Sequence, residues 1–209
     1  MKIVKPYYEI LSKIDGIEML KNIEIAGRTC YKSEDKITES SAIAFIKMLL
    51  SKGHESVLEH EKLSVRFICD RGVSHEIVRH RLASFSQEST RYCNYSSDRF
   101  GNEITFILPC WIDPEKDHEE YKAWRARMSY AENSYKSLME VFKWTPQQAR
   151  CVLPNSLKTE IVVSANLREW RLIFKQRTSS AAHPQMRELM IPLCKELQSK
   201  IPIVFDDFI

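Results

Sequence analysis

The chain has 209 residues, enough for one domain with a sizeable core, and its 44% hydrophobic and 28% charged residues are ordinary for a globular protein. The net charge of +3 is smaller than a dedicated nucleic-acid-binding protein usually carries, so positive charge matters locally. The N-terminal residues lack the apolar region of a signal peptide, and no apolar run approaches a membrane span. We therefore expect a cytoplasmic protein that binds neither membranes nor nucleic acid.

Hydrophobic periodicity predicts the first elements of the chain. Residues 38–52 place apolar side chains at helical spacing, and Gly53 follows where a helix C-cap favours glycine. Residues 63–69 alternate like a strand with one buried face. Residues 73–81 predict a short helix that ends in its cations, where positive charge is favourable to the helix dipole.

The middle of the chain predicts a strand followed by a helical excursion. Residues 104–108 read as the strand, and Asp113 and Pro114 then suit the N-cap and first position of a long helix with an aromatic stripe. Residues 145–148 fit a capping box that opens another helix. The excursion therefore covers about 113–153.

The last third alternates between strand and helix signals. Residues 158–164 are rich in β-branched side chains, and Asn166 followed by Glu169 resembles an N-cap with its acidic third position. A final helix is predicted after His183 and Pro184. With no repeat or flexible linker, the chain reads as a single domain over 1–209 in the α+β class, with sheet and helices mixed.

The stretch from Arg79 to Tyr92 is the densest concentration of hydrogen-bond donors in the chain. Its arginines present planar forks that match phosphate or carboxylate, and its hydroxyls could complete a phosphate cradle. The relevant side chains are Arg79, Arg81, Arg91, Ser84, Ser86, Ser89 and Thr90. A solvated charged loop is the alternative, but the interleaved aromatics favour a binding site.

Other chemistries find less support. His75 and His80 are five residues apart and so leave one helical face, while His54 and His60 lack an obvious third ligand, so no metal site is expected. The six cysteines are scattered without a C-x-x-C pair, and none has a sequence context that convincingly lowers its pKa. A reducing compartment and a mechanism without a cysteine nucleophile are expected.

A second set of arginines follows the first. Its members stand in or beside helices with aromatic neighbours, and they are Arg150, Arg168, Arg171 and Arg177. Two arginine-rich regions embedded in apolar residues suit a ligand with both phosphates and flat rings, such as a nucleotide.

At these residues the chain resembles the flavin-dependent thymidylate synthases (ThyX type). Their R-H-R motif, followed after seven residues by serine, is similar to Arg79-His80-Arg81 and Ser89. Further segments recur in the same order as in the family, namely 26–31, 53–60, 150–154, 166–168 and Arg177.

The resemblance implies a fold, a reaction and an assembly. The fold would be a central, largely antiparallel sheet with flanking helices. The reaction would convert dUMP to dTMP with 5,10-methylenetetrahydrofolate as carbon donor and NADPH as reductant, and FAD would be the redox carrier. The family assembles as a homotetramer with active sites formed between subunits.

The resemblance also assigns roles by position. The residues implied to contact the flavin cofactor are His54, Ser56, Arg79, His80, Arg81, Gln87, Asn166 and Arg168. Those implied to hold dUMP are Glu76, Arg79, Gln87, Glu88, Ser89, Arg91, Arg150 and Arg177. Among them Ser89 and Arg91 would serve the phosphate, and Arg177 would be catalytic, lying against the pyrimidine and stabilising its N3-deprotonated form.

Several positions depart from the family pattern. Gln87 stands where many relatives have Glu, and Glu76 where others have Gln. Leu172 replaces a common polar flavin contact, and the longer spacing before His183 puts a flavin contact there in doubt.

Two other functions are also compatible with the sequence. One is an RNA- or single-strand-binding module that uses the basic helix and the aromatics of 73–95 as a stacking platform. The other is a non-catalytic regulator that binds flavin or nucleotide. The modest net charge weakens the first, and the presence of Arg177 weakens the second.

Overall fold

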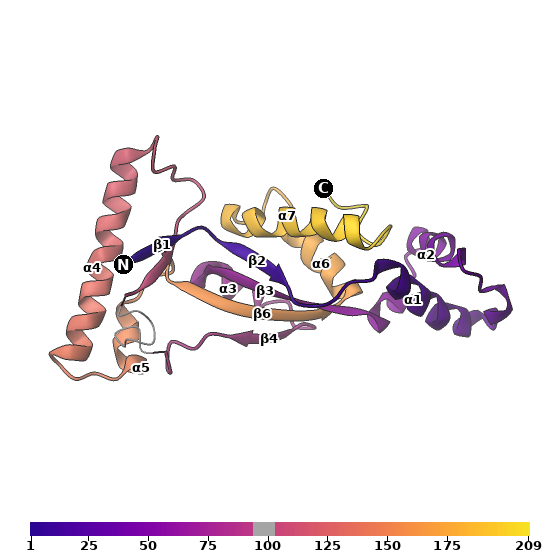
Figure 1. Cartoon of the computed structure of the whole chain (residues 1–209), viewed down its shortest axis with the longest axis horizontal. Helices are drawn as coiled ribbons and strands as arrows, with labels where there is room; N and C mark the ends of the chain where they lie inside the picture. The colour runs from indigo at the N-terminus through magenta and orange to yellow at the C-terminus, as the bar shows by residue number, and fades with distance from the viewer. Residues whose placement is uncertain (94–102) are drawn as a thin grey trace. The chain divides into compact units, whose positions relative to one another are not determined.

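The computed structural model describes residues 1–93 and 103–209 (Figure 1). These residues form two compact units, each of which collects segments from distant parts of the chain. The first unit comprises 1–7, 67–79 and 86–161, and the second comprises 8–66, 80–85 and 162–209. No helix in the described ranges is long and apolar enough to cross a membrane.

Four strands form an antiparallel sheet in the order β2-β3-β6-β4. Their bounds are Tyr7–Ile10 for β2, Lys62–Asp70 for β3, Lys158–Asn166 for β6 and Ser84–Gln87 for β4. Every second residue of β6 is buried, as its β-branched sequence predicts. The strands predicted at 63–69 and 158–164 are confirmed.

The first unit contains a smaller sheet and a helical excursion. Strands β1 (Lys2–Val4) and β5 (Thr105–Ile107) pair in parallel. Helices α4 (His118–Glu140), α5 (Pro146–Ala149) and η4 (Arg150–Val152) follow. Their core gathers Ile104, Phe106, Met128, Tyr135, Ala149 and Leu157. The predicted capping box at 145–148 is present.

The predicted start of the long helix at Asp113 is wrong, because α4 begins at His118. The Asp113 carboxylate accepts the Glu115 N–H, and the Asp113 N–H is bound by the Asp117 carboxylate, so the segment closes a local turn. Short side chains that bond nearby backbone compete with helix in this way. Asp117 is the N-cap residue instead.

The predicted helix at 73–81 is also displaced. Helix α3 runs from Arg71 to Ile77, because the Asp70 carboxylate accepts the Val73 N–H at 2.7 Å and caps its start. Its last turn tightens, and the Arg79 N–H donates to the carbonyl of Glu76. The basic side chains at 79–81 therefore lie beyond the helix, and the helix dipole does not explain them.

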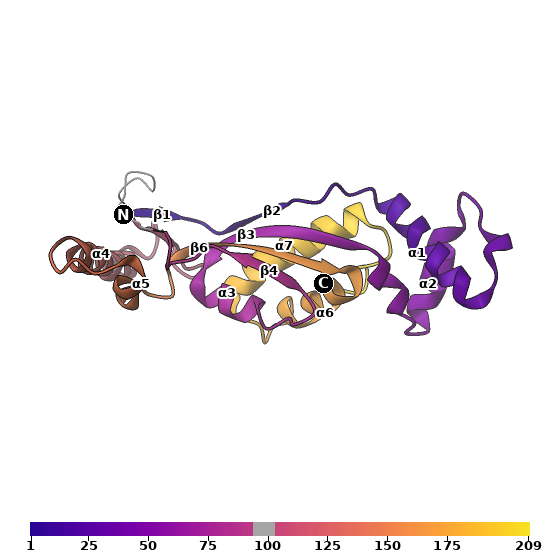
Figure 2. The same ribbon diagram turned by 90° about the horizontal axis from the view of Figure 1, so that it is seen from below.

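The second unit consists largely of helices. Helices α1 (Gly16–Tyr31) and α2 (Ser41–Ser51) lie side by side in both views (Figures 1 and 2). Short 3-10 turns η1 (Glu34–Lys36) and η2 (Ser56–His60) flank α2. Helices α6 (Leu167–Arg177) and α7 (Pro184–Lys200) complete the unit. Gly53 follows α2 with φ of 71°, which confirms the predicted glycine C-cap.

Gly16 stands where α1 begins against the end of α7, and a Cβ there would lie 2.0 Å from the Lys200 carbonyl oxygen. We expect Gly16→Ala to lower the free energy of unfolding by roughly 3 kcal/mol or more, the upper end for an overpacked site, since backbone must move. Gly53→Ala is the matched control, because no atom lies within 4 Å and only the positive φ is costly, at about 1–2 kcal/mol. Urea unfolding of both variants measures the difference. An equal or smaller loss in Gly16→Ala would contradict this packing.

Candidate active site

The histidine of the R-H-R motif is buried, whereas its two arginines are exposed. His80 Nε2 accepts a hydrogen bond from Arg177 Nε at 3.0 Å, and His80 Nδ1 lies 3.6 Å from Glu169 Oε1. Glu169 is in the first turn of α6 and Arg177 is its last residue. The sequence-predicted catalytic arginine therefore touches the central residue of the motif.

The bonding partners define the protonation of the ring. A guanidinium can only donate, so Nε2 of His80 must be the unprotonated acceptor, and the hydrogen of the neutral ring is on Nδ1, which lies 3.6 Å from Glu169 Oε1. Burial, and then the charge of Arg177, lower the pKa of His80 from 6.5 to about 4. Burial raises the pKa of Glu169. The imidazole is therefore neutral at physiological pH.

Helix α6 positions this group through its cap and its apolar face. The Asn166 side chain accepts the Glu169 N–H at 2.8 Å, which confirms the predicted N-cap. Trp170 and Phe174 are buried, and Phe174 meets Phe205 edge to face. The apolar face thus fixes α6 in the core.

A cleft of about 920 Å³ lies along α6 in the second unit. Asn166 and Arg168, both predicted flavin contacts, line it, and so does Leu172. Arg168 is ion-paired with Glu59 at 2.6 Å. Lys175 and Phe208 add a cation and an aromatic ring. The carboxylates of Glu55, Glu59, Glu169 and Asp207 line the cleft as well.

Arg171 has a structural role that its sequence context did not reveal. It is buried, binds the Asp207 carboxylate through both Nη atoms at 2.7 and 2.6 Å, and also contacts Glu55 at 3.1 Å. It donates to the Val204 carbonyl as well. These bonds from buried Arg171 hold the segment after α7 in place, and residues of that segment, Asp207 among them, form part of the cleft wall.

The other predicted flavin contacts of the second unit lie at its surface. His54 is exposed, and its Nδ1 is 3.2 Å from the Tyr31 hydroxyl. Ser56 is exposed at the start of η2, between Glu55 and Glu59, which line the cleft. Arg81 is exposed next to Leu82, another cleft residue.

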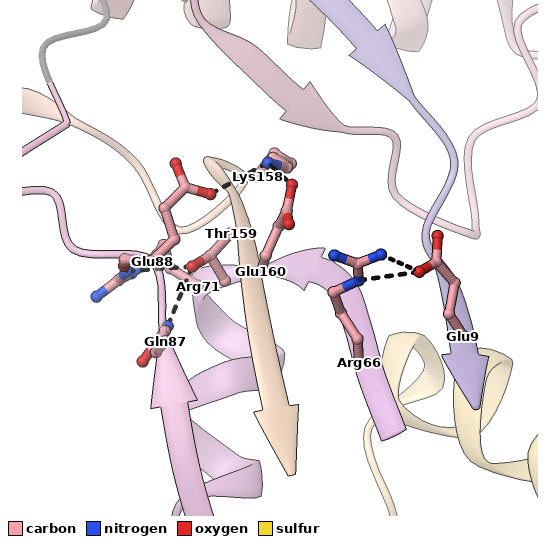
Figure 3. Close-up of polar contacts among 8 residues, drawn as sticks. All are labelled: Glu9, Arg66, Arg71, Gln87, Glu88, Lys158, Thr159 and Glu160. Atoms are coloured by element: carbon pink, nitrogen blue, oxygen red, sulfur yellow. Dashed lines mark hydrogen bonds and ion pairs between the residues drawn. The ribbon is translucent and has the colours of Figure 1, made fainter. Parts of the chain in front are cut away.

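In the first unit, the side chain of Gln87 bridges two hydroxyls, and Figure 3 shows its contact with one of them, that of Thr159. Its Nε2 donates to Ser74 Oγ at 2.8 Å and to Thr159 Oγ1 at 3.2 Å. Arg71 Nη1 reaches the same Thr159 oxygen at 3.4 Å and the Glu88 carbonyl at 3.3 Å. Gln87 thus belongs to a polar network that links α3, β4 and β6.

The carboxylate of Glu88 is held by Lys158 Nζ at 3.1 Å, and Lys158 also contacts Glu160 at 2.6 Å (Figure 3). Burial lowers the pKa of Lys158, but the two carboxylates outweigh it and the pKa is raised. The Glu88 N–H donates to the Glu160 carbonyl at 2.8 Å. These bonds favour an anchoring role for Glu88, whereas the family resemblance implied a substrate contact.

The anchored strand leads into a compact turn. The Ser89 carbonyl accepts the N–H groups of Tyr92 and Cys93, and Ser89 Oγ accepts the Arg91 N–H at 3.3 Å. Arg91 is exposed, with its guanidinium 5.4 Å from the Tyr92 ring centre. The turn therefore presents a hydroxyl and a guanidinium close together.

A second cavity, of about 400 Å³, lies in the first unit. Arg150 lines it and donates to Thr90 Oγ1 at 3.2 Å, so the structure brings this predicted substrate contact next to the 89–91 turn. Arg71 and His75 also line it, and sequence reasoning missed both. The one sequence signal for them is that Asp70 suits a helix N-cap, which would have placed Arg71 and His75 on the short helix that follows.

The predicted site residues thus fall into two groups, one in each unit. The first unit holds Glu76, Arg79, Gln87, Glu88, Ser89, Arg91 and Arg150. The second holds His54, Ser56, His80, Arg81, Asn166, Arg168 and Arg177. Tyr95, part of the stacking platform of the nucleic-acid alternative, lies outside the described residues. Among residues 1–93 and 103–209, no group of three His, Cys, Asp or Glu side chains is arranged to bind a metal.

Comparisons with known proteins give a consistent result. The family described as "Thymidylate synthase complementing protein" matches residues 14–203. The flavin-dependent thymidylate synthase of Corynebacterium aurimucosum is 35% identical over 202 residues, covering 89% of this chain and 78% of the relative. That of Pyrococcus abyssi is 33% identical over 171 residues, covering 81% of this chain and 68% of the relative.

A solved structure shares the fold. The UMP/dUMP methylase PolB from Streptomyces cacaoi, bound with 5-Br dUMP, superposes with a TM-score of 0.78 at 17% identity, covering 99% of this chain and 96% of its own. The match over residues 14–203 and the similarity to the curated enzymes place the chain in the family of flavin-dependent thymidylate synthases.

Proposed function

We propose that the protein catalyses the reductive methylation of dUMP to dTMP, with 5,10-methylenetetrahydrofolate as carbon donor, NADPH as reductant and FAD as bound cofactor. The observation that carries the proposal is the hydrogen bond from Arg177 to buried His80. This bond joins the family's R-H-R motif to Arg177, whose positive charge the proposed reaction uses at the pyrimidine. Neither rival function explains why a guanidinium is fixed in this way.

Arg177 is suited to stabilise a deprotonated pyrimidine. A guanidinium stays charged at any working pH, and a fixed cation where negative charge develops lowers the barrier without reorganising. Burial raises the pKa of the Cys194 thiol to about 11 and raises that of Cys69 further, so these two thiols are unsuited to act as nucleophiles. Charge stabilisation by Arg177 takes the place of covalent activation in this proposal.

The nucleotide is assigned to the first-unit cavity and the turn beside it. Ser89 and Arg91 would bind the phosphate, and Arg150 would bind dUMP from the cavity wall. Gln87 offers an amide oxygen beside this turn, and Glu76 and Arg79 complete the proposed set. In a homotetramer with shared active sites, Arg177 would approach this nucleotide from another subunit.

The cleft along α6 is large enough for a flavin nucleotide, and Arg168, Lys175 and Phe208 in its wall support this assignment. Asn166 and Arg168 would hold FAD from the cleft, with His54, Ser56, Arg79, His80 and Arg81 as further contacts. When bound, the flavin supplies the hydride chemistry, and the protein supplies binding, orientation and charge. Leu172 would offer only apolar contact where relatives have a polar side chain.

The absorbance of the purified protein tests this function. We expect flavin bands that NADPH bleaches, and dTMP formation when dUMP and methylenetetrahydrofolate are added. A protein that binds no added FAD would exclude the proposal. A protein that binds FAD but forms no dTMP would indicate the regulator, and salt-dependent oligonucleotide binding without flavin would indicate the nucleic-acid module.

Arg177→Ala should keep bound FAD but lower kcat by about 100-fold or more, because removal of one fixed stabilising group has that order of effect. Arg168→Ala is the contrasting variant and should mainly lose FAD. The measurements are flavin content by absorbance and steady-state dTMP formation. Near-normal turnover in Arg177→Ala would refute its assigned role.

Arg91→Ala and Arg150→Ala should raise KM for dUMP by roughly 10- to 100-fold, as expected for a lost charge-assisted hydrogen bond. The control is Arg125→Ala, since Arg125 is an exposed residue of α4 outside both cavities. Equal KM values in all three variants would show that the phosphate binds elsewhere.

Lys158→Met should raise KM for dUMP by a smaller factor, roughly threefold to tenfold, because it removes the anchor of Glu88 and loosens the turn that follows. Glu9→Gln breaks the more exposed Arg66–Glu9 ion pair (Figure 3) and should leave KM unchanged. If Lys158→Met changes stability alone, Glu88 does not position the turn.

A further inference from the structure

Glu169 is a buried carboxylate that no role assigned by family resemblance explains. It is 3% exposed, and its Oε1 faces Nδ1 of His80, the ring whose other nitrogen accepts from Arg177. We propose that Glu169 is a positioning residue, which fixes the tautomer of His80 and thereby the orientation of the Arg177 guanidinium. This inference rests on the proposed function and adds a residue to it.

The argument starts from what each group can donate. An ionised carboxylate attracts a hydrogen and repels a lone pair, so Glu169, whose Oε1 lies 3.6 Å from Nδ1, favours the tautomer with its hydrogen on Nδ1. Nε2 is then an acceptor, which is the form that Arg177 Nε requires. With the opposite tautomer, the Nε2 hydrogen and the Arg177 Nε hydrogen would face each other and the bond would be lost.

Geometry restricts the alternatives. Glu169 and Arg177 stand at opposite ends of one helix whose apolar face is buried, so their backbones are held at a fixed separation. His80 comes from the turn after α3 and is itself 5% exposed, which leaves little room for water to replace a partner. The hydrogen bond at Nε also leaves the guanidinium plane with one orientation about its stem.

Contacts link Glu169 to His80 and His80 to Arg177, and we assign each of the three residues a separate task. Arg177 is the catalytic residue of the proposed function. His80 and Glu169 act through it and need no contact with substrate. This also accounts for the central position of histidine in the R-H-R motif, because neighbouring Arg79 and Arg81 are exposed whereas His80 is not.

Nitrogen-15 NMR of histidine-labelled, FAD-loaded protein tests the tautomer directly. We expect His80 to be neutral at pH 7, protonated at Nδ1 and unprotonated at Nε2, and to titrate near pH 4. In Arg177→Ala its pKa should rise toward 6.5 but stay below it, because the nearby cation is gone while the burial remains. A hydrogen on Nε2 in the unmodified protein would overturn the proposal.

Kinetics test the consequence for turnover. Glu169→Ala should lower kcat roughly 10- to 100-fold, as expected when a reacting group is misplaced, and should change KM for dUMP far less. Glu169→Gln keeps an oxygen that can accept from Nδ1, so it should recover part of kcat. Unchanged kcat in Glu169→Ala would overturn the proposal.

Glu132→Gln is the matched control, since Glu132 is 4% exposed and lies in the first unit. It should lose stability without losing kcat per bound flavin. An equal loss of kcat in Glu132→Gln would show that removal of any buried carboxylate has this effect, and would refute positioning. If Glu169→Ala does not fold, Glu169→Gln and the NMR experiment decide. If no variant or parent forms dTMP, the proposed function fails, while the NMR result still decides the tautomer.

Discussion

The side chain of Asn166 fixes the point at which strand β6 becomes helix α6, and most of the site depends on that junction. Its oxygen satisfies the Glu169 N–H, one of the donors that a helix start leaves open. With the start of α6 fixed, Arg168 lies on the cleft, Arg171 is directed inward and Arg177 becomes the last helical residue. One cap thus sets the positions of three guanidinium groups.

Two buried charged groups of the second unit are paired with opposite charges. Arg171 meets Asp207 and Glu55, and Glu24 accepts two bonds from Arg28 in α1. Removing one partner of such a pair costs far more than the pair contributes, because the other charge would stay buried alone. His80 differs from these pairs. Its ring is neutral, so it can lie next to the Arg177 guanidinium without adding a second positive charge.

Sequence reasoning succeeded where the determinants are local. The Asn166 cap, the capping box at 145–148 and the alternating burial of β6 each follow from side chains within a few residues of one another. It failed where two local solutions compete, as at Asp113, whose carboxylate closes a turn where a helix cap was expected.

It also could not find partners that only the tertiary fold brings together. Nothing in the sequence near position 88 points to Lys158, and nothing near His80 points to Glu169, which lies 89 positions further along the chain. Glu88 and Lys158 are partly buried and His80 and Glu169 are buried, and the neighbours of a polar residue in the sequence do not show whether it is buried. The family motifs identified the right regions but not the bonds within them.

The network around Gln87 shows how this position could hold either an amide or a carboxylate. Both of its partners, Ser74 and Thr159, are hydroxyls, which rotate to donate or to accept. Here the amide donates to both, and Ser74 passes its own hydrogen to the Arg71 carbonyl. A carboxylate at position 87 would be satisfied if both hydroxyls turned to donate to it, and Ser74 would then give up its bond to the Arg71 carbonyl. The heavy atoms of this network can therefore accept either an amide or an acid at position 87, and the acid costs one hydrogen bond.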